Sequence, residues 1–276
     1  MTDIPLVPAM AAAGPDEPSR IGALLGAVLP PAACLLGLVL LWAVGSATGL
    51  IPFYFLPAPQ AVALEFVNNT EVLVRHGTAT LTEALSGFVI GNATAVVAAA
   101  VLSSVPALRD MFYPYALVSR AIPIIVFAPV VVVLLGRGYP PIIAIVSFTV
   151  YFPTFLNMMR GLAAVDADLD ELLHTFSASR RQRLFLVSFP TAVPYFFAAL
   201  KISASSCFIS ALVTEWIGAN VGLGYLVVVS SQYFKLASLW AAIFTSAGLT
   251  LSLLGLVHVA EHLCGRFTAT AAEMDA

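Results

Sequence analysis

Charged residues are scarce in this sequence, because aspartate, glutamate, lysine and arginine together make up only 10% of its 276 residues. An ordinary soluble domain carries about 25%. Hydrophobic residues make up 60%, and the mean hydropathy is +0.97. A soluble fold of this size cannot bury so much apolar surface, which excludes a cytosolic enzyme, a secreted domain and a nucleic-acid-binding protein. The composition predicts an all-α, polytopic integral membrane protein in a lipid bilayer.

Several motifs are also missing. The three cysteines, Cys34, Cys207 and Cys264, are odd in number and widely spaced, so neither a disulfide framework nor a metal cluster is indicated. No Gly-x4-Gly-Lys-Ser/Thr phosphate-binding loop occurs, so this chain cannot supply an ATP site itself. No internal repeat is visible, which weakens a secondary-transporter interpretation, since inverted repeats are common in that class.

Apolar segments of about 20 residues predict where the chain crosses the bilayer. The segment 49–80 is rich in proline and charge, so we expect it outside the membrane, with a short helix after Pro59. Residues 1–20 are expected to form a cytoplasmic tail, 21–265 a transmembrane domain and 266–276 a second tail. The six predicted spans are 23–48, 84–108, 113–135, 142–159, 191–212 and 236–259.

Lysine and arginine set the expected orientation, because their excess marks the cytoplasmic side. With both termini inside, the segment 160–190 is also cytoplasmic, and Arg120 falls within a span. The basic residues inside are then Arg20, Arg109, Arg160, Arg180, Arg181, Arg183, Lys201 and Arg266, against Arg75, Arg137 and Lys235 outside.

The segment 160–190 is the one large polar block within the hydrophobic region, and it predicts two short helices. Acidic residues from Asp166 to Glu171 suit a helix N-terminus, where the helix dipole is positive. Ser177 or Ser179 can cap the second helix, and Pro190 either ends it or starts the next span. Leucine and phenylalanine on such helices fit docking into a partner's groove. The alternative is an amphipathic loop that lies against lipid headgroups.

The spacing of this segment resembles the signature of the membrane subunits of bacterial ATP-binding-cassette (ABC) importers, which is Glu-Ala-Ala, three residues, Gly, nine residues, Ile, one residue and Leu-Pro. Ser177 is the departure that matters most, because glycine permits a positive φ and serine must adopt another turn or carry strain. The matching positions are Glu171, Leu172, Leu173, Ser177, Val187, Phe189 and Pro190.

Other segments resemble the nitrate, sulfonate and taurine branch of that family, over roughly residues 57–265. The Leu-Pro-x-Pro segment follows the first span, and Gly87-Phe88 with Gly91 falls in the second span, where we read the two glycines as a helix contact. The remaining similarities are Pro123, Pro129, Gly136-Arg137-Gly138 and the glycine-rich segment 215–226.

The resemblance implies a non-enzymatic transport subunit of the bacterial inner membrane, with no cofactor or metal of its own. Two copies would form a pore, separate ATPase subunits carrying MgATP would clamp the docking loop (residues 160–190), and an extracytoplasmic solute-binding protein would deliver substrate. The branch suggests a small organic anion such as a sulfonate or taurine, or nitrate. The expected docking residues are Glu171, Leu172, Leu173, Phe176, Ser177, Arg180, Arg181 and Pro190.

The fifth predicted span is rich in hydroxyl groups and ends at Glu215. These groups could line a translocation path or simply let helices approach closely, and Glu215 could act as a gate or lie solvated at the interface. Lys201 and Arg120 could attract an anion or extend to the headgroups. The pore and gate candidates are Ser203, Ser206, Ser210, Thr214, Glu215, Gly218, Gly222 and Gly224.

Two other functions compete with the importer. An ion-coupled secondary transporter or channel would use Glu215 and Arg120, and would need no ATP. An intramembrane metalloprotease would use the segment 258–262, which fits the His-x-x-Glu-His pattern of some zinc proteases. A zinc site needs a third ligand and an open water position, so we rank the protease low.

Overall fold

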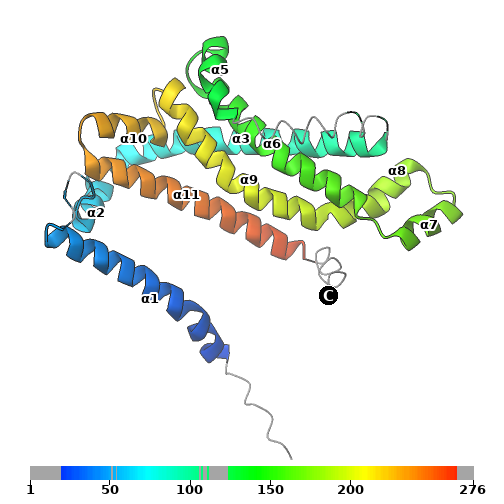
Figure 1. Ribbon diagram of the computed structural model, residues 1–276, viewed down its shortest axis with the longest axis horizontal. Coiled ribbons are helices and arrows are strands. Elements are labelled where there is room, and N and C mark those ends of the chain that lie inside the picture. The colour runs from blue at the N-terminus through cyan, green and yellow to red at the C-terminus, as the bar shows by residue number, and fades with distance from the viewer. Residues whose placement is uncertain are drawn as a thin grey trace, which may run out of the picture. The chain divides into compact units, whose positions relative to one another are not determined.

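The computed structural model describes residues 20–265 apart from 51, 54, 106, 108–110 and 112–123. All regular elements in these described ranges are helices (Figure 1). Five of the described helices are long and apolar enough to cross a membrane. The all-α class and the polytopic membrane architecture predicted from the composition are therefore confirmed. The chain divides between Pro59 and Gln60 into two compact units.

The first unit contains helix α1 (Arg20–Ala47), which runs through Pro30 and Pro31 and corresponds to the first predicted span. The chain then turns at Gly49, where φ is +73°. Trp42 Nε1 donates a hydrogen bond to the carbonyl oxygen of Pro57 at 2.9 Å. This bond ties the proline-rich segment back to the helix that precedes it.

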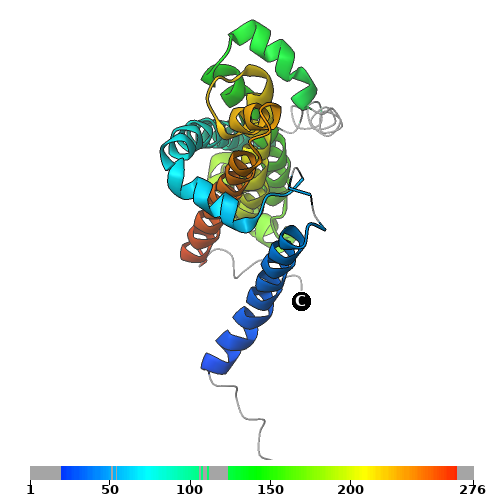
Figure 2. The same cartoon turned by 90° about the vertical axis from the view of Figure 1, so that its left-hand side faces the viewer.

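The second unit is a bundle of four long helices, α3 (Thr70–Ser104), α6 (Tyr139–Ala163), α9 (Phe189–Gly218) and α11 (Leu236–Leu263). Helix α6 packs against both α3 and α9, and α11 packs against α9 (Figure 1). Figure 2 shows the bundle from the end where α2 (Pro59–Asn68) and α10 (Leu223–Gln232) lie.

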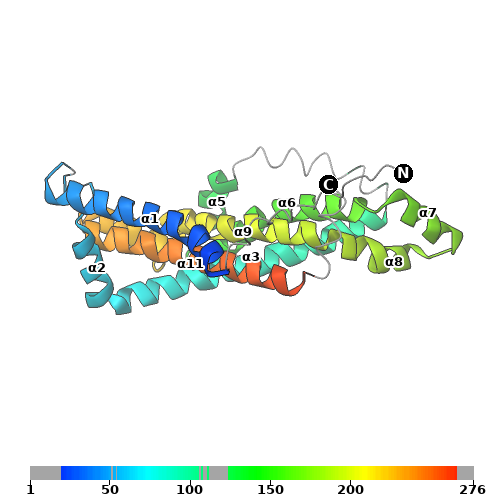
Figure 3. The ribbon, with the colours of Figure 1, turned by 90° about the horizontal axis from the view of Figure 1, so that it is seen from below.

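The docking loop contains α7 (Ala167–Thr175) and α8 (Arg180–Arg183). It lies at the opposite end of this bundle from α2 (Figure 3). The sequence placed these two polar regions on opposite sides of the membrane, and the bundle is long enough to hold them apart. Which of the two sides faces the cytoplasm stays a prediction.

Helix α3 approaches α6 closely because two glycines face it. A Cβ atom added at Gly87 would lie 2.5 Å from the side chain of Val146, and one added at Gly91 would lie 2.3 Å from the carbonyl oxygen of Ser147. Such small residues let helix backbones come together in a membrane, where apolar burial gives little preference between protein and lipid. The interpretation of these glycines as a helix contact is confirmed.

A buried polar node joins the three central helices. The Thr154 hydroxyl group on α6 donates to Asn92 Oδ1 on α3 at 2.5 Å, and lies 3.2 Å from the Ser203 hydroxyl group on α9. Asn92 Nδ2 donates to the Phe88 carbonyl oxygen at 2.7 Å. The node fixes the register of the helices, because unpaired polar groups in this dry interior are costly.

The helix that contains the second predicted span begins earlier than residue 84, since α3 starts at Thr70. The charges of Glu71 and Arg75 suggested a loop. Both side chains are exposed, however, while Leu73, Gly77 and Thr80 form a buried face at helical spacing. The helix therefore continues through a polar sequence, because its charged residues lie on the sides that do not pack.

The third predicted span, 113–135, is described only from Ile124 onward. A 3-10 turn (Ile124–Phe127) leads into the short helix α5 (Ala128–Leu135). Arg120 and Pro123, and the predicted turn at 109–110, lie outside the described residues. The predicted Gly-Arg-Gly turn is confirmed, since α5 ends before Gly136 and α6 begins at Tyr139.

The polar node yields a test of helix packing. We expect Thr154→Val to lower the apparent Tm of the purified full-length protein, with a loss of about 1 kcal/mol, because Asn92 and Ser203 lose their shared partner while the side-chain volume is kept. Thr149→Val is the matched control, since the Thr149 hydroxyl group donates only to Ile145 of its own helix. Equal Tm values for the two variants would contradict the bridging role.

Candidate functional site

The first helix of the docking loop is capped at its start. Asp166 Oδ1 accepts a hydrogen bond from the Asp168 backbone N–H at 2.8 Å. A carboxylate at this position satisfies one of the free N–H groups of the first turn and complements the helix dipole. The sequence expectation that the acidic residues begin a helix is confirmed for α7.

The same helix ends at the serine that departs from the importer signature. Ser177 has a φ of +52°, the left-handed conformation usually taken by glycine. The Ala178 N–H donates to the Leu173 carbonyl oxygen at 3.0 Å, and this six-residue closure is the hydrogen bond of a Schellman motif. The open question about this turn is thus resolved, since serine keeps the turn made for glycine and accepts the strain.

The next helical turn begins with a capping box. The Ser179 N–H donates to Gln182 Oε1 at 2.8 Å, and the Gln182 N–H donates back to Ser179 Oγ at 3.3 Å. Of the two serines considered as caps, Ser179 is the one that caps. The two ends of the loop segment between α7 and α8 are therefore both fixed by local hydrogen bonds.

Of the two roles considered for Pro190, the structure shows the start of the next span. Helix α8 passes through a π-helical turn (Leu184–Ser188) into α9 without interruption, and the Phe189 N–H bonds to the Leu184 carbonyl oxygen. Pro190 lies in the first turn of α9. The wider π turn accommodates proline, which has no N–H to donate, so the second docking helix and the fifth span form one continuous element.

Apolar side chains are exposed on this loop. Phe176 is 75% exposed, Leu172 is 51% exposed, and Leu173 is half-buried. The Arg181 guanidinium lies 5.8 Å from the centre of the Phe185 ring, a cation–π contact that holds this ring beside the charge. Glu171 is exposed, Pro190 is half-buried, and nothing is described of the Arg180 side chain.

At the opposite end of the bundle, Glu215 is completely buried. Its Oε1 atom accepts from the Thr80 hydroxyl group at 2.6 Å, and its Oε2 atom accepts from the N–H groups of Gly224 at 2.5 Å and Tyr225 at 3.4 Å. The carboxyl group therefore joins α3, α9 and α10. It caps the start of α10 by accepting from the backbone N–H groups that follow the glycine-rich turn.

Glycine at position 222 makes this arrangement possible. Gly222 has a φ of +141°, and a Cβ atom added there would lie 2.3 Å from the Glu215 carboxyl carbon. The Leu223 N–H donates to Thr80 Oγ1 at 2.7 Å, and His76 Nδ1 lies 3.1 Å from the Gly222 nitrogen. The turn is held by side chains of α3 as well as by Glu215.

Sequence reasoning missed His76, Thr80 and Glu83 as members of this site. Their spacing of four and three residues puts them on one helical face, which is the signal that could have found them. Residues 49–80 were expected outside the membrane with only a short helix after Pro59, so a helical face running on to Glu83 was not considered.

The hydroxyl groups predicted along α9 do not share one environment. Ser203, Ser210 and Thr214 are buried within the chain, and the last two donate to backbone carbonyls of α9 itself. Ser206 is half-buried and donates to the Ile202 carbonyl oxygen. Ser203 belongs to the polar node, and buried Gly218 packs against Val132.

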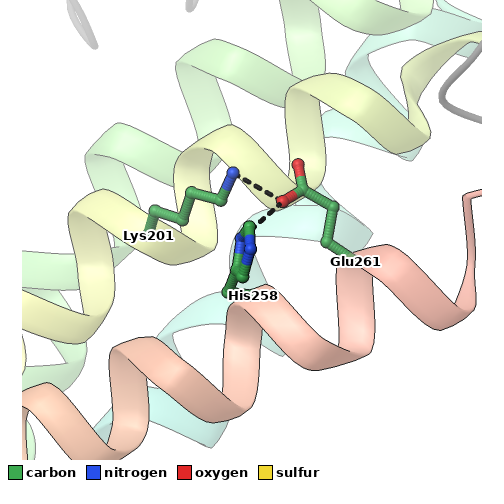
Figure 4. A network of polar contacts seen from close by, with 3 residues as sticks. All are labelled: Lys201, His258 and Glu261. Carbon is green, nitrogen blue, oxygen red and sulfur yellow. Dashed lines mark ion pairs between the residues drawn. The ribbon is translucent and has the colours of Figure 1, made fainter. Parts of the chain in front are cut away.

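Lys201 is engaged by a carboxylate rather than left free. Its Nζ atom lies 2.5 Å from Glu261 Oε2, and His258 Nδ1 lies 3.7 Å from the same oxygen (Figure 4). The pair links α9 to α11. It also occupies the carboxylate that the zinc-protease pattern would need as a general base.

Comparison with known proteins decides the family. Residues 87–262 match the sequence family described as the binding-protein-dependent transport system inner membrane component, and this match covers more than half of the chain. The chain belongs to this family. The predicted membership among ABC importer permeases, in the branch that includes sulfonate and nitrate permeases, is confirmed.

The permease has relatives of nearly its own length. It is 30% identical over 216 residues to a probable ABC transporter permease protein of Haemophilus influenzae (78% of this chain, 88% of the relative). It is 27% identical to the riboflavin transport system permease protein RibX of Chloroflexus aurantiacus (86% and 89%) and 29% identical to the formylaminopyrimidine transport permease protein ThiX of Halalkalibacterium halodurans (83% and 90%).

Further relatives are named for aliphatic sulfonates in Bacillus subtilis (22% identity) and for nitrate in Synechocystis (26%), the latter over 54% of each chain. Among solved structures, a chain of the inward-facing MetNI methionine ABC transporter aligns with a TM-score of 0.57 at 20% identity, over 71% of the permease and 96% of that chain. This likeness supports the fold.

The two serines of the docking loop should respond in opposite ways. We expect Ser177→Gly to stabilise the α7–α8 turn by about 0.5–1 kcal/mol, because glycine removes the left-handed strain. We expect Ser179→Ala to destabilise it by about 1 kcal/mol, because the cap is lost. Amide hydrogen exchange over residues 167–183 of the permease measures both effects, and a change of the same sign in both variants would refute this account.

The glycine-rich turn gives a second paired test. Gly222→Ala should sharply lower the apparent Tm, because the new methyl group meets Glu215 and the positive φ alone costs about 1–3 kcal/mol. Gly248→Ala is the control, since a Cβ atom there has nothing within 4 Å and lies in the middle of α11. It should leave the Tm unchanged or slightly raised. A tolerated Gly222→Ala would show that the turn can relax away from Glu215.

Proposed function

We propose that the permease forms, with a second copy of itself, the translocation pathway of an ATP-driven importer in a bacterial inner membrane, with both termini in the cytoplasm. MgATP would bind to two separate ATPase subunits, and an extracytoplasmic binding protein would deliver a small solute. The names of the relatives and the absence of a phosphate-binding loop support this division of labour. The observation that carries the proposal is the capped docking loop with its exposed Phe176.

The docking loop has a locally hydrogen-bonded shape and presents exposed apolar side chains. Both its turns are closed by hydrogen bonds within the loop, so its shape does not depend on a partner. Phe176 projects at the turn and Leu172 lies one helical turn before it, both exposed, with Glu171 and Arg181 nearby for polar contacts. Apolar anchors with a charged rim suit a groove on an ATPase subunit. Because α8 continues into α9, movement of the loop would be passed directly to a membrane-spanning helix.

A second copy fits against the exposed side of α9. Ile202, Ile209 and Trp216 are at least half exposed and recur every seven residues. This spacing forms one stripe along a helix, as in paired helices. Ser206 adds a hydroxyl group close to the stripe. We therefore place the solute path between the α9 helices of two copies, with Ser206 as its clearest polar lining group in this chain.

The solute is a small organic molecule delivered by the binding protein. The family branch favoured a sulfonate, taurine or nitrate, and Lys201 and Arg120 were the candidate attractors for an anion. Glu261 pairs with Lys201, which weakens the case for Lys201, and Arg120 lies outside the described residues. We therefore place nitrogen heterocycles, the class named for the RibX and ThiX relatives, ahead of the anions.

Disrupting the docking anchors tests the assembly. We expect Phe176→Asp and Leu173→Asp to abolish copurification of a P-loop ATPase from native membranes and to abolish uptake, because a charge replaces an apolar anchor, while the protein still inserts. Leu263→Asp is the control, as Leu263 is 82% exposed and lies outside the docking loop at the end of α11. Uptake of a labelled pyrimidine against labelled taurine in wild-type cells identifies the solute class. Normal uptake by both loop variants would overturn the docking assignment.

A further inference from the structure

Glu83 is a second buried acidic residue of the bundle, and it lies against Glu215. It belongs to α3, is 2% exposed, and its carboxyl group is within hydrogen-bonding reach of the Glu215 carboxyl group on α9. Two carboxyl groups in contact, both shielded from water, cannot both remain ionised without a proton or a cation between them.

No cationic side chain in the described part of the chain compensates this pair. Lys201 and His258 pair with Glu261, at a different place in the bundle. The groups around the carboxyl pair are the Thr80 hydroxyl group and His76 from α3, and the Gly224 and Tyr225 backbone from α10. His76 stacks on the Tyr225 ring and meets the Gly222 backbone, rather than either glutamate.

The hydrogen-bond donors are shared unequally between the two carboxyl groups. Glu215 accepts from one hydroxyl group and two backbone N–H groups, at 2.5–3.4 Å. Glu83 Oε2 is buried and receives no donor from the described residues. A carboxylate is stabilised where donors converge, and a neutral carboxylic acid tolerates a site without donors. The arrangement therefore assigns the charge to Glu215 and the proton to Glu83.

We propose that Glu83 and Glu215 form a single proton-binding site, in which Glu83 is the neutral acid and donates its O–H to the Glu215 carboxylate. This acid–carboxylate pair adds a fourth donor to Glu215 and so helps to hold the glycine-rich turn against α3. The site does not depend on the proposed transport function, since it follows from burial and hydrogen bonding within one chain.

A monovalent metal ion between the carboxyl groups is the rival occupant. Such an ion would need the lone pairs of several oxygen atoms. The Glu215 oxygens already accept hydrogen bonds from Thr80, Gly224 and Tyr225, which leaves fewer of their lone pairs for an ion. A proton needs only the one contact between the two carboxyl groups, and this contact is present.

The asymmetry of the pair gives the test. Glutamine at position 83 can still donate a hydrogen bond to Glu215. Glutamine at position 215 instead places an NH2 donor against the Thr80 hydroxyl group or the Gly224 and Tyr225 N–H groups, which are themselves donors. In the full-length permease in lipid nanodiscs, Glu83→Gln should keep the wild-type Tm within a degree or so, while Glu215→Gln should lower it by several degrees. Glu83→Met fills the space without a hydrogen-bond donor, and its Tm should lie between those of the two glutamine variants.

Infrared difference spectroscopy detects the protonated carboxyl group directly in the wild type. The carbonyl stretch of a protonated carboxyl group, shifted in D2O, should be present at neutral pH and lost in Glu83→Gln. A band that persists in Glu83→Gln, or equal Tm losses in the two glutamine variants, overturns the assignment of the proton. A wild-type Tm that rises with sodium or potassium, together with no such band, assigns the site to a metal ion instead.

Discussion

A carboxylate that cannot be hydrated must be hydrogen-bonded by the protein, and Glu215 imposes this requirement on one whole end of the bundle. The hydroxyl group of Thr80 reaches it from α3, and backbone N–H groups reach it from the start of α10. The turn between α9 and α10 has to bend sharply for those N–H groups to converge, which is why glycine occupies position 222. The path of the chain here follows from the needs of one side chain.

The other end of the bundle is organised by backbone closure rather than by a buried charge. The turn after α7 and the start of α8 are both closed by short-range hydrogen bonds, and the π turn then passes the chain into α9. Local closure keeps the exposed apolar side chains in place without burying them. A surface that must be both rigid and free to meet a partner is well served by this arrangement.

Composition and periodicity were sufficient for the fold class and for most of the helices, because a bilayer demands long apolar segments and leaves few alternatives. The two helices of the docking loop were also predictable, although the sequence left open whether Ser177 or Ser179 caps the second. The start of α3 was not, because Glu71 and Arg75 lowered the hydropathy of a segment that packs through Leu73, Gly77 and Thr80 on another face. The role of Glu83 could not be read either, since its contact with Glu215 joins positions far apart in the sequence. The same holds for Lys201, whose partner Glu261 lies on another helix.

The uninterrupted helical path from Arg181 to Gly218 spans 38 residues, or about 57 Å at 1.5 Å per residue. This continuous helical element connects the docking loop at one end with Glu215 at the other. The rotation between its two ends is fixed by the number of residues, because each residue of its α-helical part turns the helix by about 100°. Adding or removing one residue within it would swing Glu215 away from Thr80 while leaving the hydrophobic length almost unchanged. The length of this segment is thus constrained by rotation far more tightly than by the thickness of the membrane.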